Sequence, residues 1–248
     1  MERYEELVNA LGKYSPIVFL GGAGVSTESG IPDFRSESGI YKTISEYGYP
    51  PETILSAPFF HSETEIFYDY YKKYLLHPDA QPNRAHKALA RLERAGKLSG
   101  VVTQNIDNLH QEAGSINVFE LHGSVYRNYC TKCGKPHNLQ YIKDAKGIPK
   151  CGACGGLIKP DVVLYGEGLD DLVLRGAIGR ISGAEMLIIG GTSLAVYPAA
   201  GLINYFNGKV IAIINKSQTP ADEQAHIVIN ESIGEVLGGA VDKLMGTN

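Results

Sequence analysis

Short apolar runs recur along the chain and alternate with amphipathic stretches. Each run contains three to five residues, mostly Val, Ile and Leu, as is typical of strands that are buried on both faces of a parallel sheet. The runs are residues 17–20, 101–103, 118–121, 162–165, 186–189, 210–214 and 227–229. We expect these runs to be the strands of one sheet.

Helical periodicity separates several of the apolar runs. Apolar side chains recur every three or four residues along 85–95, 174–181 and 233–244, which predicts amphipathic helices. The last stretch opens on Ser232 with Glu235 three residues later, a pattern that predicts a capping box. Strands that alternate with helices predict an α/β fold, in which helices cover both faces of a doubly wound parallel sheet.

Two stretches interrupt this alternation. Residues 36–82 are rich in Tyr, Phe and Pro and predict a helical insertion, whereas residues 126–157 contain all four cysteines and many polar or Gly residues. We expect the two insertions to form a smaller domain. The remaining segments, 1–35, 83–125 and 158–248, would form a discontinuous Rossmann-like domain, with a cleft between the two.

The length and net charge of the chain narrow the classes of protein to which it can belong. The chain has 248 residues, 23 Lys+Arg and 27 Asp+Glu, which gives a formal net charge of −4. This length suits one large domain with an insertion. The acidic balance argues against nucleic-acid binding, and no apolar stretch approaches the roughly 18 residues of a membrane span. We therefore expect a cytoplasmic protein that binds neither nucleic acid nor a membrane.

The four cysteines form two closely spaced pairs. Cys130 and Cys133 are separated by two residues, as are Cys151 and Cys154. This spacing is typical of a four-thiolate zinc site, and a redox-active dithiol is the alternative. Four thiolates complete a tetrahedron and leave no position for water, so the predicted zinc ion is structural.

Polar and Gly residues follow five of the apolar runs, at the strand ends where parallel sheets bind ligands. They are residues 21–27, 104–107, 122–123, 190–193 and 215–217. The first set is Gly-rich, so its backbone can approach a pyrophosphate, whose charge free amides at a following helix N-terminus would stabilise. Taken alone this motif is weak, because such a turn is often only structural. It also departs from the dehydrogenase fingerprint, with Thr27 in place of the third Gly.

His122 is the histidine that directly ends a predicted core strand beside this nucleotide site. An imidazole with a pKa near 6.5 is suited to general-base catalysis. The alternative is a histidine that only satisfies a hydrogen bond.

These motifs together resemble the sirtuins, a family of NAD-dependent protein deacylases. The resemblance covers most of the chain and includes the four cysteines together with residues 22–27, 29–35, 103–107, 121–123, 165–167, 191–194, 196–199 and 215–216. It implies one structural zinc ion and NAD as co-substrate, bound in an extended form in the cleft.

The resemblance also implies the residues that contact NAD. They are Gly22, Ala23, Gly24, Thr27, Asp33, Phe34, Arg35, Gln104, Asn105, Ile106, Asp107, His122, Gly191, Thr192, Ser193, Asn215, Lys216 and Ile233. Within this set His122 and Asn105 are implied to be catalytic, His122 as the general base and Asn105 by positioning a water molecule.

For the second substrate the resemblance implies an acyl-lysine protein or peptide. The peptide would add as a strand between Val163, Leu164, Tyr165 and Gly166 on one side and Val196 and Tyr197 on the other. Sirtuins that prefer succinyl-lysine or malonyl-lysine carry a Tyr and, three residues later, an Arg. Here Tyr68 matches but Tyr71 replaces the Arg, so we expect acetyl and other neutral acyl groups to be preferred.

The implied reaction is NAD-dependent deacylation, an acyl transfer that yields free lysine, nicotinamide and 2′-O-acyl-ADP-ribose. A protein mono-ADP-ribosyltransferase that uses the same NAD site is the alternative among enzymes, and a dehydrogenase would form NADH instead. Outside enzymes, the paired cysteines are also compatible with a zinc-ribbon adaptor, against which the acidic balance argues.

Overall fold

Six of the expected runs are the strands of one parallel sheet. The computed structural model describes residues 2–32 and 43–246. The strands are β1 (Ile17–Gly21), β2 (Leu98–Thr103), β3 (Val118–Glu120), β7 (Met186–Gly190), β8 (Val210–Ile214) and β9 (Ile227–Ile229). Their order is β3-β2-β1-β7-β8-β9. The first strand thus lies at the centre of the sheet, the next two extend it to the β3 edge, and the last three extend it to the β9 edge. The two halves diverge between β1 and β7, where such sheets bind ligands.

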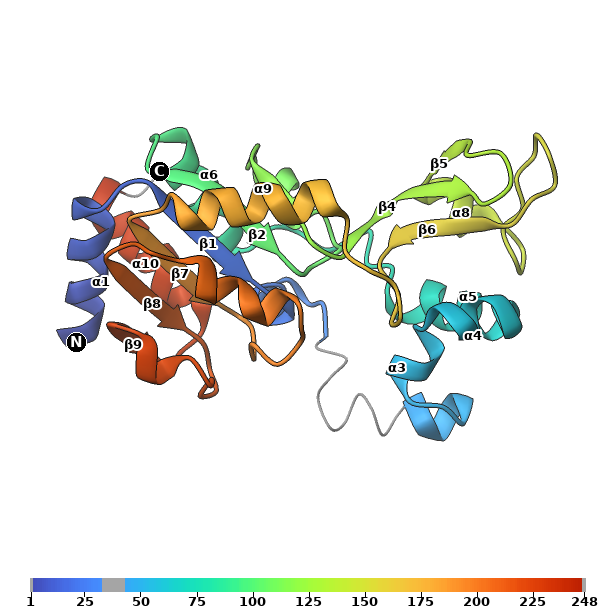
Figure 1. Ribbon diagram of the computed structural model, residues 1–248, viewed down its shortest axis with the longest axis horizontal. Coiled ribbons are helices and arrows are strands. Elements are labelled where there is room, and N and C mark those ends of the chain that lie inside the picture. The colour runs from blue at the N-terminus through green and yellow to red at the C-terminus, as the bar shows by residue number, and fades with distance from the viewer. Residues whose placement is uncertain (1, 33–42, 247–248) are drawn as a thin grey trace.

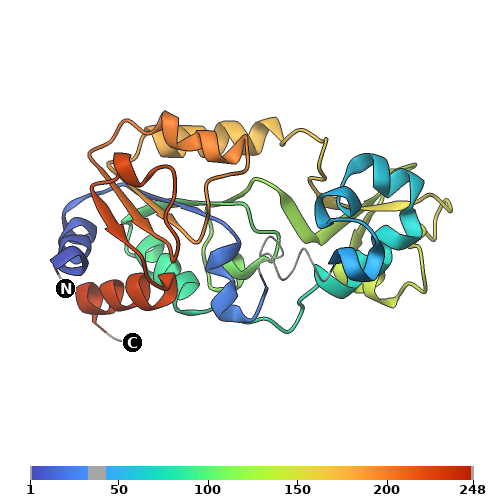
Figure 2. The same cartoon turned by 90° about the horizontal axis from the view of Figure 1, so that it is seen from below.

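Helices cover both faces of this sheet, as predicted. The helices are α1 (Glu2–Lys13), α6 (Arg84–Arg94) and α10 (Ile233–Met245) on one face, and α9 (Asp171–Ser182) with the 3₁₀ helix η3 (Ala199–Tyr205) on the other. Figure 2 shows the two helical layers on opposite sides of the strands. Along β1, Phe19 packs into the first layer and Leu20 into the second. The continuous apolar run is thus explained by burial on both faces.

The N-terminus of α10 is capped differently from the prediction. Ser232 occupies the N-cap position, but its side chain makes no capping hydrogen bond. Glu235 instead forms an ion pair with Arg84 at 3.0 Å. The amide of Gly234 donates to Glu28 Oε1 at 2.9 Å, so a carboxylate from the loop after β1 caps this helix. The capping-box prediction was wrong because a distant side chain supplies the acceptor.

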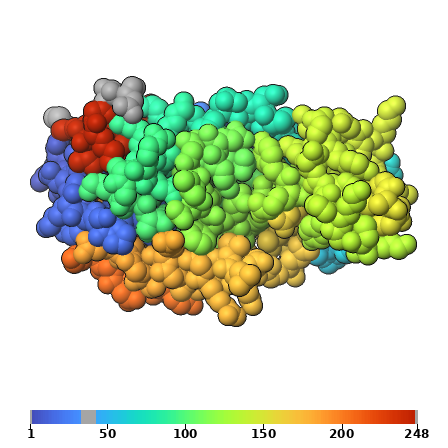
Figure 3. Space-filling model, turned by 90° about the horizontal axis from the view of Figure 1, so that it is seen from above, coloured from blue at the N-terminus to red at the C-terminus, as the bar shows by residue number. Residues whose placement is uncertain are grey.

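A second, three-stranded sheet forms the core of the smaller part of the molecule. Its strands are antiparallel, in the order β5 (Pro136–Asn138), β4 (Gly123–Cys130) and β6 (Ile158–Val162). Around it lie α3 (Pro51–Ile54), α4 (Ala57–Ser62), α5 (Thr64–Tyr74) and α8 (Leu139–Asp144). These elements share one aromatic-rich core. The two insertions therefore meet, at the right of Figure 1 and at the opposite end from the N- and C-terminal segments in Figure 3.

The run at 162–165 is the exception among the expected strands. Val162 ends β6, which pairs with β4 in the smaller sheet, and residues 163–165 follow as a connecting segment, in which Tyr165 forms an isolated bridge with Ser56. The prediction that this run joins the parallel sheet was wrong. Because β6 belongs to the smaller sheet, we propose to place the end of the second insertion after Val162 and not before Ile158.

The rest of the described chain contains short elements, η1 (Ala23–Val25), η2 (Thr27–Ser29), α7 (Leu109–Glu112) and η4 (Asp222–Gln224). Within the described residues, no helix has the length and apolar character that crossing a membrane requires.

Two buried histidines join α6 to α7. The rings of His86 and His110 lie 4.7 Å apart between centroids, and both residues are at most 1% exposed. His86 Nδ1 accepts the amide of Asn83, whereas His86 Nε2 and both ring nitrogens of His110 have no hydrogen-bond partner among the described residues. Burial lowers the pKa of His86 from 6.5 to about 4, and it holds the pKa of His110 well below its ordinary value.

We expect the free energy of unfolding to fall as the pH decreases from about 6.5 toward 4. Because the folded-state pKa values are lowered, the unfolded chain binds more protons in this range, and the stability present above pH 6.5 is lost. For His86 alone the loss is about 2 kcal/mol at pH 5. Urea unfolding at pH 7.5 and pH 5 measures it. His110→Phe should flatten the dependence, and exposed His61→Gln should not. An unchanged slope in His110→Phe would contradict this origin.

Candidate active site

The carboxyl ends of β1, β2, β3 and β7 open onto one cavity of about 490 Å³. The parallel sheet supplies one wall, and the smaller part of the molecule supplies the other. This volume is typical of a site for a small molecule or cofactor. The cavity therefore lies where the sequence predicted the nucleotide site.

The Gly-rich loop after β1 touches the loop after β7. The amide of Gly24 donates to the Gly191 carbonyl at 2.8 Å. A Cβ on Gly24 would lie 2.8 Å from Gly191 Cα, and Gly191 itself has a φ of +59° with its hypothetical Cβ 2.3 Å from the amide nitrogen of Val25. Contacts this short exclude a side chain at either position. The glycines are thus required for two loops to pack closely at the edge of the cavity.

The predicted helix after this loop is absent from the described residues. Two single 3₁₀ turns, η1 and η2, replace it, and the amides of Val25 and Ser26 donate within the first turn, to Gly22 and Ala23. The helix N-terminus that follows the loop thus belongs to a short 3₁₀ helix, and the stabilisation of a pyrophosphate by its free amides stays a prediction.

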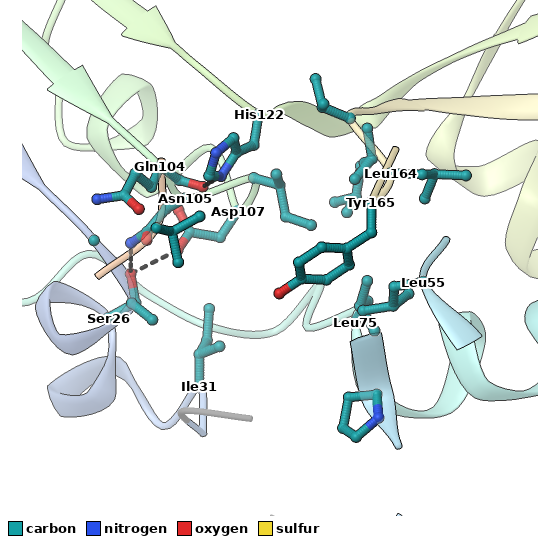
Figure 4. A pocket seen from close by; sticks show the side chains of 18 of the residues that line it. Ser26, Ile31, Leu55, Leu75, Gln104, Asn105, Asp107, His122, Leu164 and Tyr165 are labelled. Atoms are coloured by element: carbon teal, nitrogen blue, oxygen red, sulfur yellow. Dashed lines mark hydrogen bonds between the residues drawn. The ribbon is translucent and has the colours of Figure 1, made fainter. Parts of the chain in front are cut away.

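A hydrogen-bonded triad forms the polar wall of the cavity (Figure 4). The hydroxyl of Ser26 donates to Asp107 Oδ2 at 2.6 Å and accepts from Asn105 Nδ2 at 2.9 Å. Asp107 Oδ1 accepts the amide of Leu109 at 3.0 Å, which anchors the loop to α7. Burial raises the pKa of the Asp107 carboxyl, and the bond from Ser26 partly offsets that rise. The triad holds Asn105 and Asp107 in fixed orientations toward the cavity.

His122 lies between β3 and β4, at the junction of the two parts. Its Nδ1 is 3.0 Å from the carbonyl oxygen of Gln104. A carbonyl only accepts, so Nδ1 carries the proton and Nε2 carries the lone pair in the neutral ring. Gln104 is held in turn by its side chain, which donates to Thr192 Oγ1 at 3.1 Å. This arrangement prepares the imidazole to act as a general base.

The opposite wall is apolar and comes from the smaller part. Leu55 and Leu75 lie across the cavity from Ser26, and the ring of Tyr165 projects into the space between the two walls (Figure 4). The amide of Val163 donates to the carbonyl of His122 at 3.0 Å, and that of Tyr165 donates to Leu55 at 2.9 Å. The segment after β6 is thereby fixed to His122 itself.

Most of the predicted site residues line this one cavity. From the NAD set they are Gly22, Ala23, Gly24, Gln104, Asn105, Ile106, Asp107, His122, Gly191, Thr192 and Ser193. From the peptide set they are Val163, Leu164, Tyr165, Gly166, Val196 and Tyr197. The structure therefore gathers the expected NAD and peptide segments around a single space.

Other predicted residues lie away from the cavity lining. The hydroxyl of Thr27 donates to the Gly24 carbonyl, and Asn215, which follows β8, donates from its side chain to the carbonyl of Ser217. Lys216 is exposed beside Asn215. The predicted NAD contacts Asp33, Phe34 and Arg35 lie outside the described residues.

Three predicted contacts are buried in apolar cores instead. Ile233 is 3% exposed and packs within the core of the parallel sheet. Tyr68 and Tyr71 are at most 1% exposed in the aromatic core of the smaller part, where Tyr71 stacks on Phe67 and Tyr68 meets it edge-on. None of the three is among the described residues that line the cavity, so their contacts with NAD or the acyl group stay predictions. The physical reason for their burial is that the helical pattern turns these apolar faces inward.

Several residues of the cavity were not predicted as site residues. Ser26, Ile31 and Glu167 lie within the quoted motifs but had no role, and Leu55 and Leu75 come from outside them. The available signal for the role of Ser26 was its position in the Gly-rich segment that follows a predicted strand. Nothing in the sequence marks Leu55 and Leu75, because their exposure to the cavity depends on how the two parts of the molecule pack.

The four cysteines meet at the tip of the smaller sheet, and their sulfur atoms lie within 4.8 Å of one another. Cys130 Sγ is 3.4 Å from Cys154 Sγ, and Cys133 Sγ is 3.8 Å from Cys151 Sγ. Tetrahedral zinc, with Zn–S bonds of about 2.3 Å, requires sulfur atoms about 3.8 Å apart. Burial raises the pKa of the Cys130 thiol, but amide hydrogen bonds outweigh it and bring the pKa to about 6. The donor set fits a closed, structural zinc site.

The sequence matches a known family. A family model described as the Sir2 family matches residues 22–198. An NAD-dependent protein deacetylase of Clostridium acetobutylicum is 56% identical over 96% of this chain and 97% of its own length. One of Clostridium perfringens is 57% identical over 97% of this chain and 99% of its own length.

Solved structures share the whole fold. A Sir2 structure with a deacetylated p53 peptide and 3′-O-acetyl ADP-ribose matches with a TM-score of 0.88 and 40% identity, over 98% of this chain and 99% of that one. A complex of a Sir2 homologue with NAD matches with a TM-score of 0.88 and 37% identity, over 97% of this chain and 93% of that one. The resemblance to sirtuins is thus confirmed, and the chain belongs to the Sir2 family.

Proposed function

We propose that the protein is an NAD-dependent protein-lysine deacetylase. It transfers the acyl group of an acyl-lysine to ADP-ribose and releases free lysine and nicotinamide. Relatives above 50% identity over nearly their full length carry the name NAD-dependent protein deacetylase, and a solved Sir2 neighbour is bound to a propionylated peptide. The cavity, with a polar wall on the sheet and an apolar wall opposite, supports the same assignment.

The observation that carries the proposal is the setting of His122. Its Nδ1 donates to the Gln104 carbonyl, so Nε2 carries the lone pair of the neutral ring, and His122 lines a cavity that NAD and an acyl-lysine can share. In deacylation the amide oxygen of the acyl-lysine attacks the ribose carbon that bears nicotinamide. Nicotinamide leaves, and the acyl-lysine is joined to the ribose as an alkylimidate. His122 then removes a proton so that the ribose 2′-hydroxyl attacks the imidate carbon, and water releases the lysine. The apolar wall keeps other water molecules away from the intermediate.

For the other predicted site residues we propose roles that agree with their positions around the triad of Ser26, Asn105 and Asp107. Asp107 accepts a hydrogen bond from the nicotinamide carboxamide, and Asn105, oriented by Ser26, positions a water molecule. Gly22, Ala23 and Gly24 approach the phosphates, while Thr192 and Ser193 contact the adenosine half beside them. The peptide lies along the cavity between residues 163–166 and 196–197.

Incubation of the protein with NAD and an acetyl-lysine peptide tests the proposal, with free nicotinamide and deacetylated peptide followed by mass spectrometry. Equal amounts of the two products are expected, and neither should form without NAD. A mono-ADP-ribosyltransferase would leave the acetyl group in place and add the mass of ADP-ribose to a protein. NADH formation without nicotinamide release would indicate a dehydrogenase. Either result would contradict deacetylation.

We also propose that the natural substrates are acyl-lysine-containing proteins. Cytoplasmic location and the lack of nucleic-acid or membrane binding remain predictions from the composition.

We expect an acetyl-lysine peptide to be preferred over a succinyl-lysine peptide. The described residues that line the cavity include Glu52, Asp107 and Glu167 and include no Lys or Arg. Lys72 donates to the carbonyls of Ala145 and Gly147, so its ammonium group is engaged elsewhere. A succinyl carboxylate would lose its hydration without a cation, and a charged hydrogen bond of about 1.5–3 kcal/mol corresponds to a preference of roughly 10- to 150-fold.

Values of kcat/KM on matched acetyl-, propionyl- and succinyl-lysine peptides measure this preference. The propionyl peptide controls for acyl-group size, and we expect it to be accepted more readily than the succinyl peptide. A succinyl preference would mean that a cation reaches the acyl group, and Arg35, outside the described residues, would be the first to substitute.

A further inference from the structure

A buried lysine lies behind the wall that faces the peptide. Lys159 is in β6 and is 7% exposed. Its ammonium group donates to the carbonyl of Val162 and to Glu167 Oε2, each at 3.0 Å, and lies 3.4 Å from the carbonyl of Pro160. These three acceptors match the three donors of an ammonium group. A charge buried at this depth is costly unless it is paired and hydrogen-bonded, so this complete set of partners marks a built feature.

Glu167 connects that ammonium group to the backbone of the cavity wall. Its Oε2 accepts the amide of Leu164 at 2.8 Å in addition to the bond from Lys159. The amide of Glu167 donates back to the carbonyl of Leu164 at 2.9 Å. Between them Gly166 has a φ of +92°, in the region that favours glycine. Residues 164–167 therefore form a turn that is closed by the backbone and by one carboxylate oxygen.

The pair holds both ends of the segment that lines the cavity. Lys159 binds the carbonyl of Val162, where the segment leaves β6, and through Glu167 it fixes the turn where the segment ends. The middle is held by bonds to the carbonyls of His122 and Leu55. The NAD side of the cavity, with the Gly24 and Gly191 loops, is built from other elements. The contacts of Lys159 and Glu167 are thus confined to the peptide side.

We propose that Lys159 and Glu167 are positioning residues for the acyl-lysine peptide. The ion pair sets the backbone of residues 163–166 in the shape that receives the peptide and acts through that segment without touching the reacting atoms. This inference rests on the proposed deacetylase function and adds to it a pair of side chains that governs peptide affinity separately from NAD affinity.

Steady-state kinetics on the full-length protein with an acetyl-lysine peptide tests the role. Glu167→Gln keeps the shape of the side chain but loses its charge, and Lys159→Met removes the ammonium group while filling the space. We expect each variant to raise the peptide KM about tenfold, the lower end of the effect of a charged hydrogen bond. The NAD KM and kcat should stay within about twofold of wild type. Lys159→Arg, which can still pair with Glu167, should largely restore the peptide KM.

Lys209→Met is the matched control. Lys209 pairs with Glu185 at 2.6 Å and immediately precedes β8, at the amino end of the parallel strands and away from the cavity. Loss of this exposed ion pair should leave both KM values unchanged, because such pairs contribute little. If Lys159→Met fails to fold, Glu167→Gln decides, since its side chain is 30% exposed and the substitution preserves volume.

The positioning role would be overturned by an unchanged peptide KM in Glu167→Gln, by a parallel rise of both KM values, or by a fall in kcat alone. Titration calorimetry of the peptide without NAD separates this inference from the deacetylase function. If the wild type binds the peptide in the titration but releases no nicotinamide when NAD is added, the deacetylase function is refuted. The peptide Kd of Glu167→Gln would still test the role of the Lys159–Glu167 pair. A wild type that neither binds nor deacetylates the peptide would refute both.

Discussion

His122→Ala is expected to lower kcat for deacetylation by about 10²- to 10⁴-fold, the usual contribution of a general base. The imidazole is held by the Gln104 carbonyl, with Nε2 as the proton acceptor, and alanine offers no group that replaces it. The hydrogen bonds of Ser26 with Asn105 and Asp107 do not involve the imidazole, so NAD should bind the variant with nearly unchanged affinity. Nicotinamide release in the presence of acetyl-lysine peptide and calorimetric titration with NAD measure the two effects.

His61→Ala is the matched control for this variant, because His61 is exposed at the end of α4. It should retain wild-type turnover. A His122→Ala variant with near wild-type turnover at neutral pH would remove His122 from the mechanism. A variant that has lost NAD binding as well would assign the residue to binding and leave the base unidentified.

Loss of any one zinc ligand should unfold the smaller sheet. Structural zinc contributes folding free energy on the order of 10 kcal/mol in small modules, and the cysteines connect the end of β4 to two turns in the segment between β4 and β6. We therefore expect Cys151→Ser to lose bound zinc, amide protection along β4, β5 and β6, and activity together. Metal analysis and hydrogen exchange measure the first two, and the parallel sheet should keep its protection.

Lys132→Ala is the control at the same tip, since Lys132 is exposed between two of the ligands. It should keep one zinc ion per chain and full activity. Active, purified wild-type protein without stoichiometric zinc would refute the structural role of the metal.

The sheet was predictable because its strands are apolar on both faces. The runs that became β1, β7 and β8 are continuous in the sequence and fully buried in the structure. The zinc site was predictable for another reason, because two local turns carry all four ligands. The position of His122 at the cavity followed from its place after a strand, since strand ends meet at one edge of a parallel sheet.

What escaped prediction depends on contacts between distant segments. The run at 162–165 has the composition of a core strand, but its partners are β4 and Ser56, which no local pattern reveals. Ser232 and Glu235 have the capping-box spacing, yet Glu28 lies near enough to take the amide of Gly234. In the sequence Lys159 cannot be told from a surface lysine. Its burial is accompanied by contacts with the Val162 carbonyl and with Glu167, which depend on the turn that follows β6.

The strand order also determines when the site can exist during synthesis of the chain. Ile17 pairs with Met186 at the centre of the sheet, so β1 lacks one neighbour until most of the chain has left the ribosome. The smaller sheet is contiguous from β4 to β6, and local contacts of this kind form faster than pairings between distant segments. His122 and the peptide wall can thus be assembled in a nascent chain whose Gly191 loop has not yet been made. The two substrates would share a complete cavity only after the Gly191 loop has been made, and shorter nascent chains would not consume NAD.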